Sequence, residues 1–284
     1  MQIISFLKAV VALLLGCCMT LSAAGFPRVP HEKDFELVWS DEFDGDALDT
    51  AKWKAHHGGD DAQNPAVRRG SYWLTDMATV EDGSLHIRTE YYPDGYQGNQ
   101  KPGWYTCGLD TAGLYEQRYG YFEIRCILPK GTGMWAAFWM HCSGMANVDG
   151  GGTDGAEIDV FEAPFYSERV NRKVASNLHI DGYGEAHQSK KVCEAYVLFN
   201  NPYEAYNTYG VEWNEDGYTF YINGIRTGRS DFGGASQVPE YLILSVEVGG
   251  ENGIPGDSWA GDPLAEDSET SDFIVDYVRA YQYK

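Results

Sequence analysis

Three carboxylic acids stand close together in the segment EIDVFE of the chain, at Glu157, Asp159 and Glu162. If this segment is a β-strand, alternate residues share a face, so Glu157 and Asp159 point the same way. Glu162 lies five positions after Glu157 and therefore has the opposite parity. One extra residue, a β-bulge at Val160 or Phe161, brings Glu162 back to the face of the other acids. The sequence thus predicts three acids on one face of one bulged strand.

Paired carboxyl groups of this kind suit the hydrolysis of a glycosidic bond. Hydrolysis with retention needs two carboxyl groups about 5–5.5 Å apart, one as nucleophile and one as acid and then base. Four strand steps place Glu157 and Glu162 roughly 13 Å apart at Cα, a gap that two long side chains leaning together can close. Asp159 between them can hydrogen-bond the nucleophile, and its negative charge favours a protonated Glu162. A solvated acidic face is the alternative, because with 42 Asp and Glu residues in 284 the spacing arises by chance roughly once.

Two tryptophans just upstream give the acids a context. In the segment GTGMWAAFWM, Trp135 and Trp139 fall on one face of a strand, while Ala136, Phe138 and Met140 fall on the other. Indole rings opposite a core-like face suggest a platform on which sugar rings stack. A pair of core tryptophans is the alternative interpretation.

The rest of the chain predicts an all-β fold that would position these residues. Aromatic residues make up 14% of the chain, and turn signals recur between short runs of alternating polarity. An Asn-Gly turn at Asn223 joins two such runs into a predicted hairpin with a tight primed turn. We expect two antiparallel sheets packed as a sandwich. Further strands are predicted over 84–89, 241–248 and 273–281, with a long surface loop over 249–272.

The N-terminus carries an export signal. Residues 1–24 combine an apolar run with the small residues of Ser22–Ala24, which is typical of a secretory signal peptide. The alternative is a lipoprotein signal that ends before Cys17 in the sequence LLGC and leads to a cell-surface anchor. One catalytic domain is expected over 25–284, preceded by a lead-in over 25–36. Four cysteines remain, whose pairing stays open between disulfides and free thiols: Cys107, Cys126, Cys142 and Cys193.

Net charge narrows the range of partners. The formal net charge of −21 argues against a nucleic acid or an anionic membrane, whose phosphates would be repelled. The same charge disfavours a heavily sulfated polysaccharide unless a local basic patch overrides it. After the signal, no apolar run reaches the 18 residues of a membrane span, so we expect a secreted monomer.

Several ordered motifs resemble those of glycoside hydrolase family 16 in its bulged, laminarinase-like form. The resemblance covers nearly the whole mature chain and includes the two segments above together with WSDEFDG at 39–45, YGYFEIR at 119–125, YGVEW at 209–213, YTFYING at 218–224 and DYVR at 276–279. It implies a concanavalin A-like β-jelly roll with a concave substrate cleft. It also implies a secreted, retaining endo-glycosidase with Glu157 as nucleophile, Asp159 as its helper and Glu162 as acid/base.

The resemblance extends to residues outside the acidic strand. Trp135 and Trp139 resemble the family's subsite tryptophans, and His179 resembles a histidine of the cleft on a neighbouring strand. A strand histidine with a local hydrogen bond is the alternative for His179. No cofactor is expected for catalysis. A structural Ca²⁺ on the convex side is implied, with hard oxygen ligands from three positions: Glu42, Gly83 (its carbonyl) and Asp276.

Departures from the family pattern leave the substrate open. Ala136 stands where glucan-cleaving members usually have proline, and the motif Asn-Asn-Glu-Leu-Gln is absent. Glu247 is unusual on its predicted strand and could bind sugar hydroxyls from the cleft, while Arg68 and Arg69 offer donors for hydroxyls or for a negatively charged substituent. The leading hypothesis is an endo-β-1,3- or β-1,3(4)-glucanase. The alternatives are an endo-β-galactosidase acting on a galactan or host glycan and a non-catalytic lectin of the same fold.

Overall fold

The computed structural model describes residues 30, 32–166, 172–197, 200–264 and 270–284. The predicted signal peptide and Cys17 lie outside the described residues. Among these residues, no helix is long and apolar enough to cross a membrane. In the described part of the chain the helices are four short 3₁₀ turns: η1 (Glu32–Asp34), η2 (Thr75–Met77), η3 (Tyr96–Gly98) and η4 (Ser143–Ala146).

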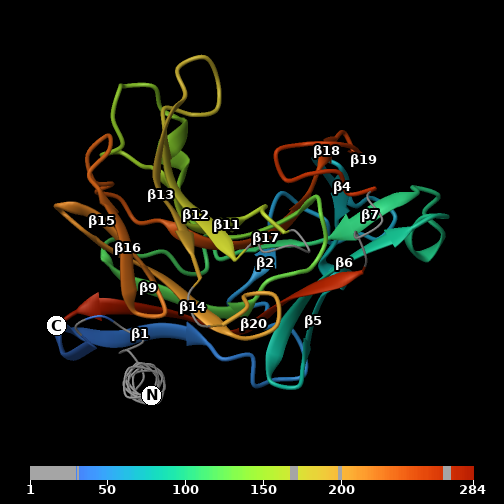
Figure 1. Cartoon of the computed structure of the whole chain (residues 1–284), viewed down its shortest axis with the longest axis horizontal. Helices are drawn as coiled ribbons and strands as arrows, with labels where there is room; N and C mark the ends of the chain where they lie inside the picture. The colour runs from blue at the N-terminus through green and yellow to red at the C-terminus, as the bar shows by residue number, and fades with distance from the viewer. Residues whose placement is uncertain (1–29, 31, 167–171, 198–199, 265–269) are drawn as a thin grey trace, which may run out of the picture.

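Two large sheets make up the molecule, as the alternating sequence predicts. Figure 1 shows them as two layers, with β11, β12 and β13 above β14, β20 and β1. The eleven-stranded sheet has the order β16 (Ile225–Ser230), β15 (Gly217–Ile222), β14 (Asn207–Asn214), β9 (Gly120–Ile127), β20 (Ser271–Tyr283), β6 (Ser84–Tyr92), β7 (Gly103–Thr106), β4 (Ser71–Trp73) and β3 (Ala66–Arg68), with β1 (Phe35–Asp41) on β20 and β5 (Ala78–Glu81) on β6.

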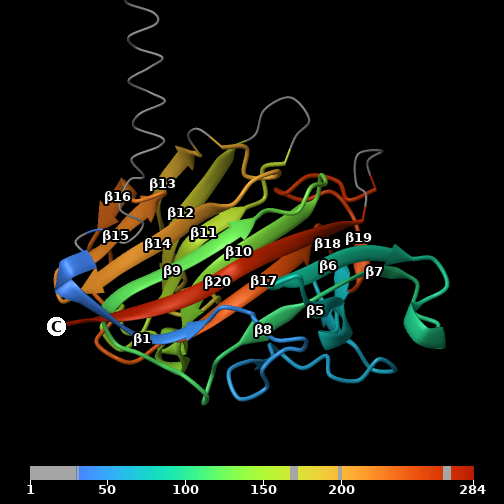
Figure 2. The same ribbon diagram turned by 90° about the horizontal axis from the view of Figure 1, so that it is seen from below.

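The second large sheet carries the acidic segment. Its seven strands have the order β13 (Gln188–Tyr196), β12 (Lys173–Ile180), β11 (Glu157–Ala163), β10 (Met134–His141), β17 (Tyr241–Val248), β8 (Gly108–Asp110) and β2 (Lys54–Ala55). The view of Figure 2 shows the long central strands of the two layers running in similar directions. Among the described strands all pairings are antiparallel except that of β4 with β7, which is parallel.

The core lies between the two sheets, where each contributes the apolar half of its alternating strands. Phe138 of β10 and Phe161 of β11 are fully buried and face Phe122 of β9 and Phe273 of β20 within one cluster. Full burial of such a side chain contributes about 1.5–3 kcal/mol each. The outer face of the seven-stranded sheet is left free for polar side chains.

The local predictions hold with two corrections. Asn223 and Gly224 have φ of 51° and 74°, as a primed turn between β15 and β16 requires. The loop predicted over 249–272 instead contains a short hairpin of β18 (Gly250–Glu251) and β19 (Ile254–Pro255), and β20 starts at Ser271. The lead-in expected over 25–36 also ends early, because β1 begins at Phe35 and pairs with the last strand. The two-residue strands β18 and β19 are too short for an alternation of polarity to mark them.

The four cysteines within the described residues are free thiols. Cys107, Cys126 and Cys142 are buried, and Cys193 is half-buried. Burial raises the pKa of the Cys142 thiol to about 11, so this side chain is a neutral part of the core. Cys17 lies outside the described residues.

Candidate active site

The predicted bulge is present on β11 and lies at Val160. Opposite β10, Phe161 pairs with Phe138 and Asp159 pairs with Trp139, so Val160 is the extra residue. Glu157, Asp159 and Glu162 are 9%, 3% and 8% exposed. The alternative of a solvated acidic face is therefore wrong: all three acids are buried in the floor of a cleft.

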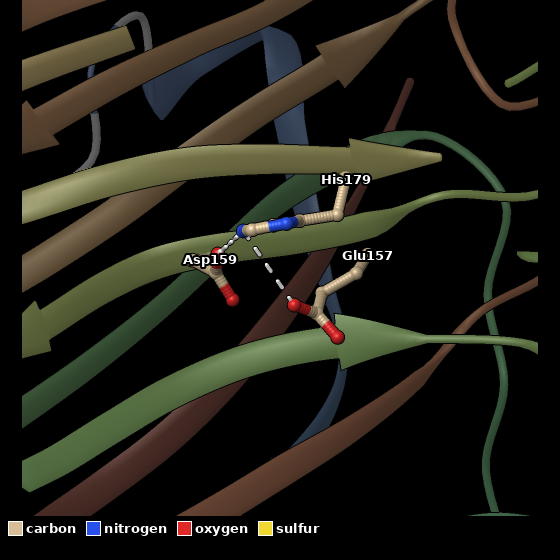
Figure 3. Close-up of side chains that lie close together, drawn as sticks. All are labelled: Glu157, Asp159 and His179. Atoms are coloured by element: carbon tan, nitrogen blue, oxygen red, sulfur yellow. Dashed lines mark ion pairs between the residues drawn. The ribbon is translucent and has the colours of Figure 1, made fainter. Parts of the chain in front are cut away.

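His179 of β12 lies beside the first two acids, as strand alternation predicts. Its Nε2 is 3.2 Å from an oxygen of Asp159 and 3.7 Å from one of Glu157, and Figure 3 shows the three side chains converging. Its Nδ1 lies 2.8 Å from Nε2 of His187, whose ring is parallel to its own. Two neighbours thus fix the orientation of the imidazole; its role in substrate binding stays a prediction.

Glu162 has the environment of a proton donor. Burial raises the pKa of its carboxyl well above the ordinary value, and the charge of Asp159 acts in the same direction. The side-chain amide of Asn177 donates to Glu162 Oε2 and opposes this rise of the pKa. Asn177 is two residues before His179 on β12, so the same alternation that places His179 could have identified it.

Glu157 differs from Glu162 in the number of groups that favour its charge. Burial raises the pKa of Glu157, but His179, a hydrogen bond donated by the Tyr183 hydroxyl, and Arg68 all lower it. Burial and the charge of Glu157 raise the pKa of Asp159 well above its ordinary value. The three acids consequently share protons, and Glu157 is the one whose surroundings most favour ionisation.

Two of these acids and His179 form a group that could hold a metal ion. Ligand atoms of Glu157, Asp159 and His179 all lie within 4.8 Å of one another, and within the described ranges this is the group of three or more such side chains that could hold an ion. Carboxylate and imidazole donors suit a divalent cation of the first transition series. That catalysis needs no cofactor remains a prediction.

A cleft of about 810 Å³ runs over the acids. Its lining starts at Lys191 on β13, crosses β12, β11, β10 and β17, and reaches His56 just after β2. From β13 to β2 there are six strand intervals of about 4.8 Å, or about 29 Å in total. A groove of this length holds several units of a polymer, rather than a single sugar.

Both predicted tryptophans line this cleft. Ala136, Phe138 and Met140 lie in the main core. Trp135 is half-buried, whereas Trp139 is 8% exposed and forms a small buried cluster with Ala137 and Ile243, so the alternative of a core position holds in part for Trp139. The Trp139 indole N–H donates to the Ser245 hydroxyl at 3.0 Å. Trp135 packs edge-on against the half-exposed Trp259 at 4.5 Å between ring centroids. Trp259 belongs to the segment after β19, where no periodicity marked it in the sequence.

Glu247 lies on the cleft side of β17 but its oxygens are occupied by arginines. Arg68 approaches Oε1 through Nε at 2.6 Å, and Arg69 Nε donates to Oε2. The Arg69 guanidinium also lies 5.0 Å from the ring centroid of Trp135. The oxygens of Glu247 are therefore used to hold two arginines that line the cleft, and not directly to bind sugar hydroxyls as predicted.

The residues predicted to bind calcium have other partners. Both oxygens of Glu42 accept hydrogen bonds from Arg279, at 2.9 and 2.7 Å, and Asp276 pairs with Arg125 at 2.5 Å. Gly83 has φ of 74° in the turn between β5 and β6. Each carboxylate is paired with an arginine in this structure, and calcium binding stays a prediction.

Known proteins with related sequences and folds agree with this geometry. Residues 36–283 match the family model described as Beta-porphyranase A-D, GH16 domain. The chain is 28% identical to a Beta-glucanase of Rhodothermus marinus over 289 residues, covering 96% of this chain and 92% of the relative. It is 30% identical over 283 residues to Glucan endo-1,3-beta-glucosidase A1 of Niallia circulans, covering 91% of this chain but only 39% of that longer protein.

A solved structure extends the likeness to three dimensions. The catalytic domain of an endo-1,3-beta-glucanase (laminarinase) from Thermotoga petrophila RKU-1 superposes with a TM-score of 0.69 and 27% sequence identity, covering 88% of this chain and 99% of that one. The two sheets are therefore those of the jelly roll that the motifs implied. The chain belongs to glycoside hydrolase family 16 and is a glycoside hydrolase.

Proposed function

We propose that this chain is a retaining endo-β-glycosidase that cleaves a polysaccharide through a glycosyl-enzyme intermediate. The observation that carries the proposal is the β11 bulge, which puts Glu157 and Glu162 on one face of the strand in the cleft. Glu157 attacks the anomeric carbon while Glu162 protonates the departing glycosidic oxygen. Glu162 then removes a proton from water, which attacks the same carbon and returns Glu157 to its carboxylate form.

The differing surroundings of the two glutamates support this division of roles. A general acid must hold its proton near neutral pH, and burial together with Asp159 raises the pKa of Glu162. A nucleophile must be ionised, and His179 together with Tyr183 opposes the rise in the pKa of Glu157. The length of the cleft, which crosses strands from β13 to β2, supports attack within a polymer rather than at its end.

We propose a β-1,3-glucan or a mixed-linkage β-1,3(4)-glucan as the substrate. The glucanase relatives and the laminarinase fold support this choice at 27–30% identity. Trp135 and Trp139 on the cleft wall supply the flat apolar surfaces on which neutral glucose rings stack.

A galactan is the second candidate. The match to the Beta-porphyranase A-D family model supports it, as do the cleft arginines Arg68 and Arg69. Glu247 offsets one of the two positive charges, so a single net charge remains for an anionic substituent. Ala136 in place of the usual proline also separates this chain from the glucan-cleaving pattern.

A panel of polysaccharides tests reaction and substrate together. Purified enzyme is incubated with laminarin, lichenan, agarose and porphyran, and oligosaccharides are resolved by mass and chromatography. Products from laminarin or lichenan support the glucanase, whereas products only from porphyran or agarose replace it with the galactanase. On the substrate cleaved, proton NMR should first detect the anomer with the configuration of the bond that was broken; the opposite anomer would exclude retention.

The Glu162→Gln variant separates an enzyme from a lectin of the same fold. It should lose about 10²- to 10⁴-fold in kcat/KM on the polymer, the usual contribution of a general acid. Glu36→Gln, at an exposed position of β1 in the other sheet, is the matched control and should be unaffected. Binding with no cleavage by the wild type would favour the lectin.

We further propose that the protein acts outside the cell as a monomer. The export signal at residues 1–24 supports secretion, and the sequence LLGC before and at Cys17 supports a surface lipoprotein as the alternative. Fractionation of the native host into medium and membrane, with mass analysis of the mature N-terminus, distinguishes the two. Light scattering of the purified chain tests its oligomeric state.

A further inference from the structure

The loop between β12 and β13 carries a tyrosine to the predicted nucleophile. Tyr183 is 64% exposed, yet its hydroxyl donates to Oε2 of Glu157. It is preceded by Asp181 and Gly182, which both adopt left-handed backbone conformations with φ of 63° and 68°. Strand alternation does not predict this contact, because the loop leaves the strand through a turn.

Specific contacts fix this loop. The carboxylate of Asp181 accepts the backbone N–H groups of Asp149 and Gly150 at 3.0 and 2.9 Å. It also accepts the side-chain amide of Gln188 at 2.6 Å, at the start of β13. The base of the loop is thereby tied to the segment before β11. A tyrosine on such a base has a defined position and does not sample the whole cleft mouth.

The Tyr183 ring is held by two histidines. It lies nearly parallel to His141, at 13° and 6.3 Å between centroids, and 6.0 Å from His187. Burial lowers the pKa of His141 to about 4, so His141 is a neutral surface near neutral pH. The ring contacts orient the phenol without providing a competing charge at His141.

We propose that Tyr183 is a further catalytic residue, whose hydroxyl stabilises the Glu157 carboxylate as it is released from the glycosyl-enzyme. This proposal rests on the proposed function. The two oxygens of Glu157 have unlike partners: Oε1 lies 3.7 Å from His179 Nε2, and Oε2 accepts the Tyr183 hydrogen bond. Tyr183 therefore touches the group that breaks its bond to the sugar.

The change in charge on Glu157 identifies the step that the Tyr183 hydrogen bond accelerates most. In the glycosyl-enzyme, Glu157 is a neutral ester and a weak acceptor. During release, water oxygen bonds to the anomeric carbon, Glu162 takes the water proton, and the electron pair of the breaking C–O bond returns to Glu157. The Tyr183 O–H donates to the growing negative charge and keeps its own proton. A hydrogen bond that strengthens only in the transition state lowers the barrier of that step.

Other charged groups around Glu157 act on its second oxygen or from farther away. His179 contacts Oε1. Although the Tyr183 side chain is largely exposed, the surroundings of its hydroxyl in the cleft exclude solvent, and this together with the negative charge of Glu157 raises the pKa of the phenol, which keeps it a donor. The remaining charged neighbours lie on β11, on or just before β17, and on β3: Asp159, Glu162, Glu240, Glu247 and Arg68. Loss of Tyr183 therefore removes a hydrogen bond that these groups do not replace at Oε2.

Tyr183→Phe tests the proposal because it keeps the ring contacts and removes only the hydroxyl. With an aryl glycoside of the sugar cleaved in the polysaccharide panel, the variant should show a burst of released phenol. Its steady-state kcat should fall about 10- to 100-fold, the range for losing a hydrogen bond to a charged group. KM should fall by a similar factor because the intermediate accumulates. The value of kcat/KM in the pH-independent region should therefore change little. The acid limb of kcat/KM should move to higher pH.

A second measurement does not depend on turnover. Enzyme labelled with ¹³C at the glutamate side-chain carboxyl is titrated by NMR, with Glu157 assigned through Glu157→Gln. Tyr183→Phe should raise the pH at which Glu157 titrates, while Tyr196→Phe, an exposed tyrosine on β13, should not.

The outcomes separate failure of this proposal from failure of the proposed function. An unshifted Glu157 titration, or equal losses of kcat and kcat/KM without a burst, would overturn the role of Tyr183 while hydrolysis itself stands. Absence of hydrolysis of every polysaccharide and glycoside by the wild type would overturn both, and the titration would then still report whether Tyr183 stabilises the Glu157 carboxylate.

Discussion

A buried acid beneath the catalytic strand gives a measurable prediction about stability. Glu240 is fully buried just before β17, and its Oε1 accepts the backbone N–H of Ala156, the residue before Glu157. Burial raises the pKa of Glu240 to about 8, although hydrogen bonds from Ser236 and Ala156 oppose the rise. Near neutral pH the folded chain therefore holds a proton at Glu240 that the unfolded chain releases.

The sign and size of the effect follow from this difference. The pKa of Glu240 is 4.5 before and about 8 after burial, so the folded state binds more protons between these values and stability falls as pH rises. Each unit corresponds to 1.36 kcal/mol, which gives a penalty of about 3 kcal/mol at pH 7 and about 5 kcal/mol at pH 9. Below pH 4.5 the penalty vanishes.

Replacing Glu240 by Gln removes the ionisation but retains the carbonyl that accepts from Ala156. The difference in unfolding free energy between Glu240→Gln and wild type should therefore grow in favour of the variant from pH 4 to pH 9. Urea denaturation of both proteins at pH 4, 7 and 9 measures it, and the titrations of all other groups cancel in the difference. A difference independent of pH would refute the reasoning, since the variant would then act through packing alone.

Three further predictions concern the cleft and the convex side. Asn177→Ala should raise the pKa of Glu162, because its carboxylate loses a donor; the alkaline limb of the pH–kcat/KM profile should move to higher pH, and an unmoved limb would contradict this. Trp259→Ala should raise KM for the polymer about tenfold, or 1.4 kcal/mol, with kcat nearly unchanged, and shortened oligosaccharides should show less difference. If Glu42 and Asp276 hold calcium, chelation should lower the Tm in a thermal melt. An unchanged Tm would contradict calcium binding and leave both carboxylates paired only with their arginines.

The sequence predicted those parts of the site that depend on strand alternation. Glu157, Asp159 and His179 share a face because the side-chain period of a strand is two. Glu162 lies an odd number of residues after Glu157, and this spacing was enough to predict the bulge. The Asn-Gly turn likewise requires a backbone that few other residue pairs adopt. Such predictions need only neighbours in the chain.

Contacts between distant segments could not be predicted in the same way. Glu247 is 179 residues from Arg68 in sequence. The sequence predicted that Glu247 binds sugar hydroxyls, whereas in the structure its oxygens accept from Arg68 and Arg69. Tyr183 lies in a loop whose course follows from the positive φ of Asp181 and Gly182, not from any periodic pattern. The alternation of side chains along one strand is a local property, whereas the meeting of loops over the face of a sheet depends on the complete fold.

The unlike roles of two chemically identical glutamates arise from those distant contacts. The bulge alone would place two equivalent buried acids in one cleft, and mutual repulsion would leave their proton unassigned. Glu157 then acquires His179 from β12, Tyr183 from the following loop and the field of Arg68 from β3, all of which favour its charge. Glu162 has fewer such groups, the amide of Asn177 and the more weakly acting His179, and it faces the charge of Asp159. The strand brings the acids together, and in the proposed mechanism the segments around it decide which of them attacks and which holds the proton.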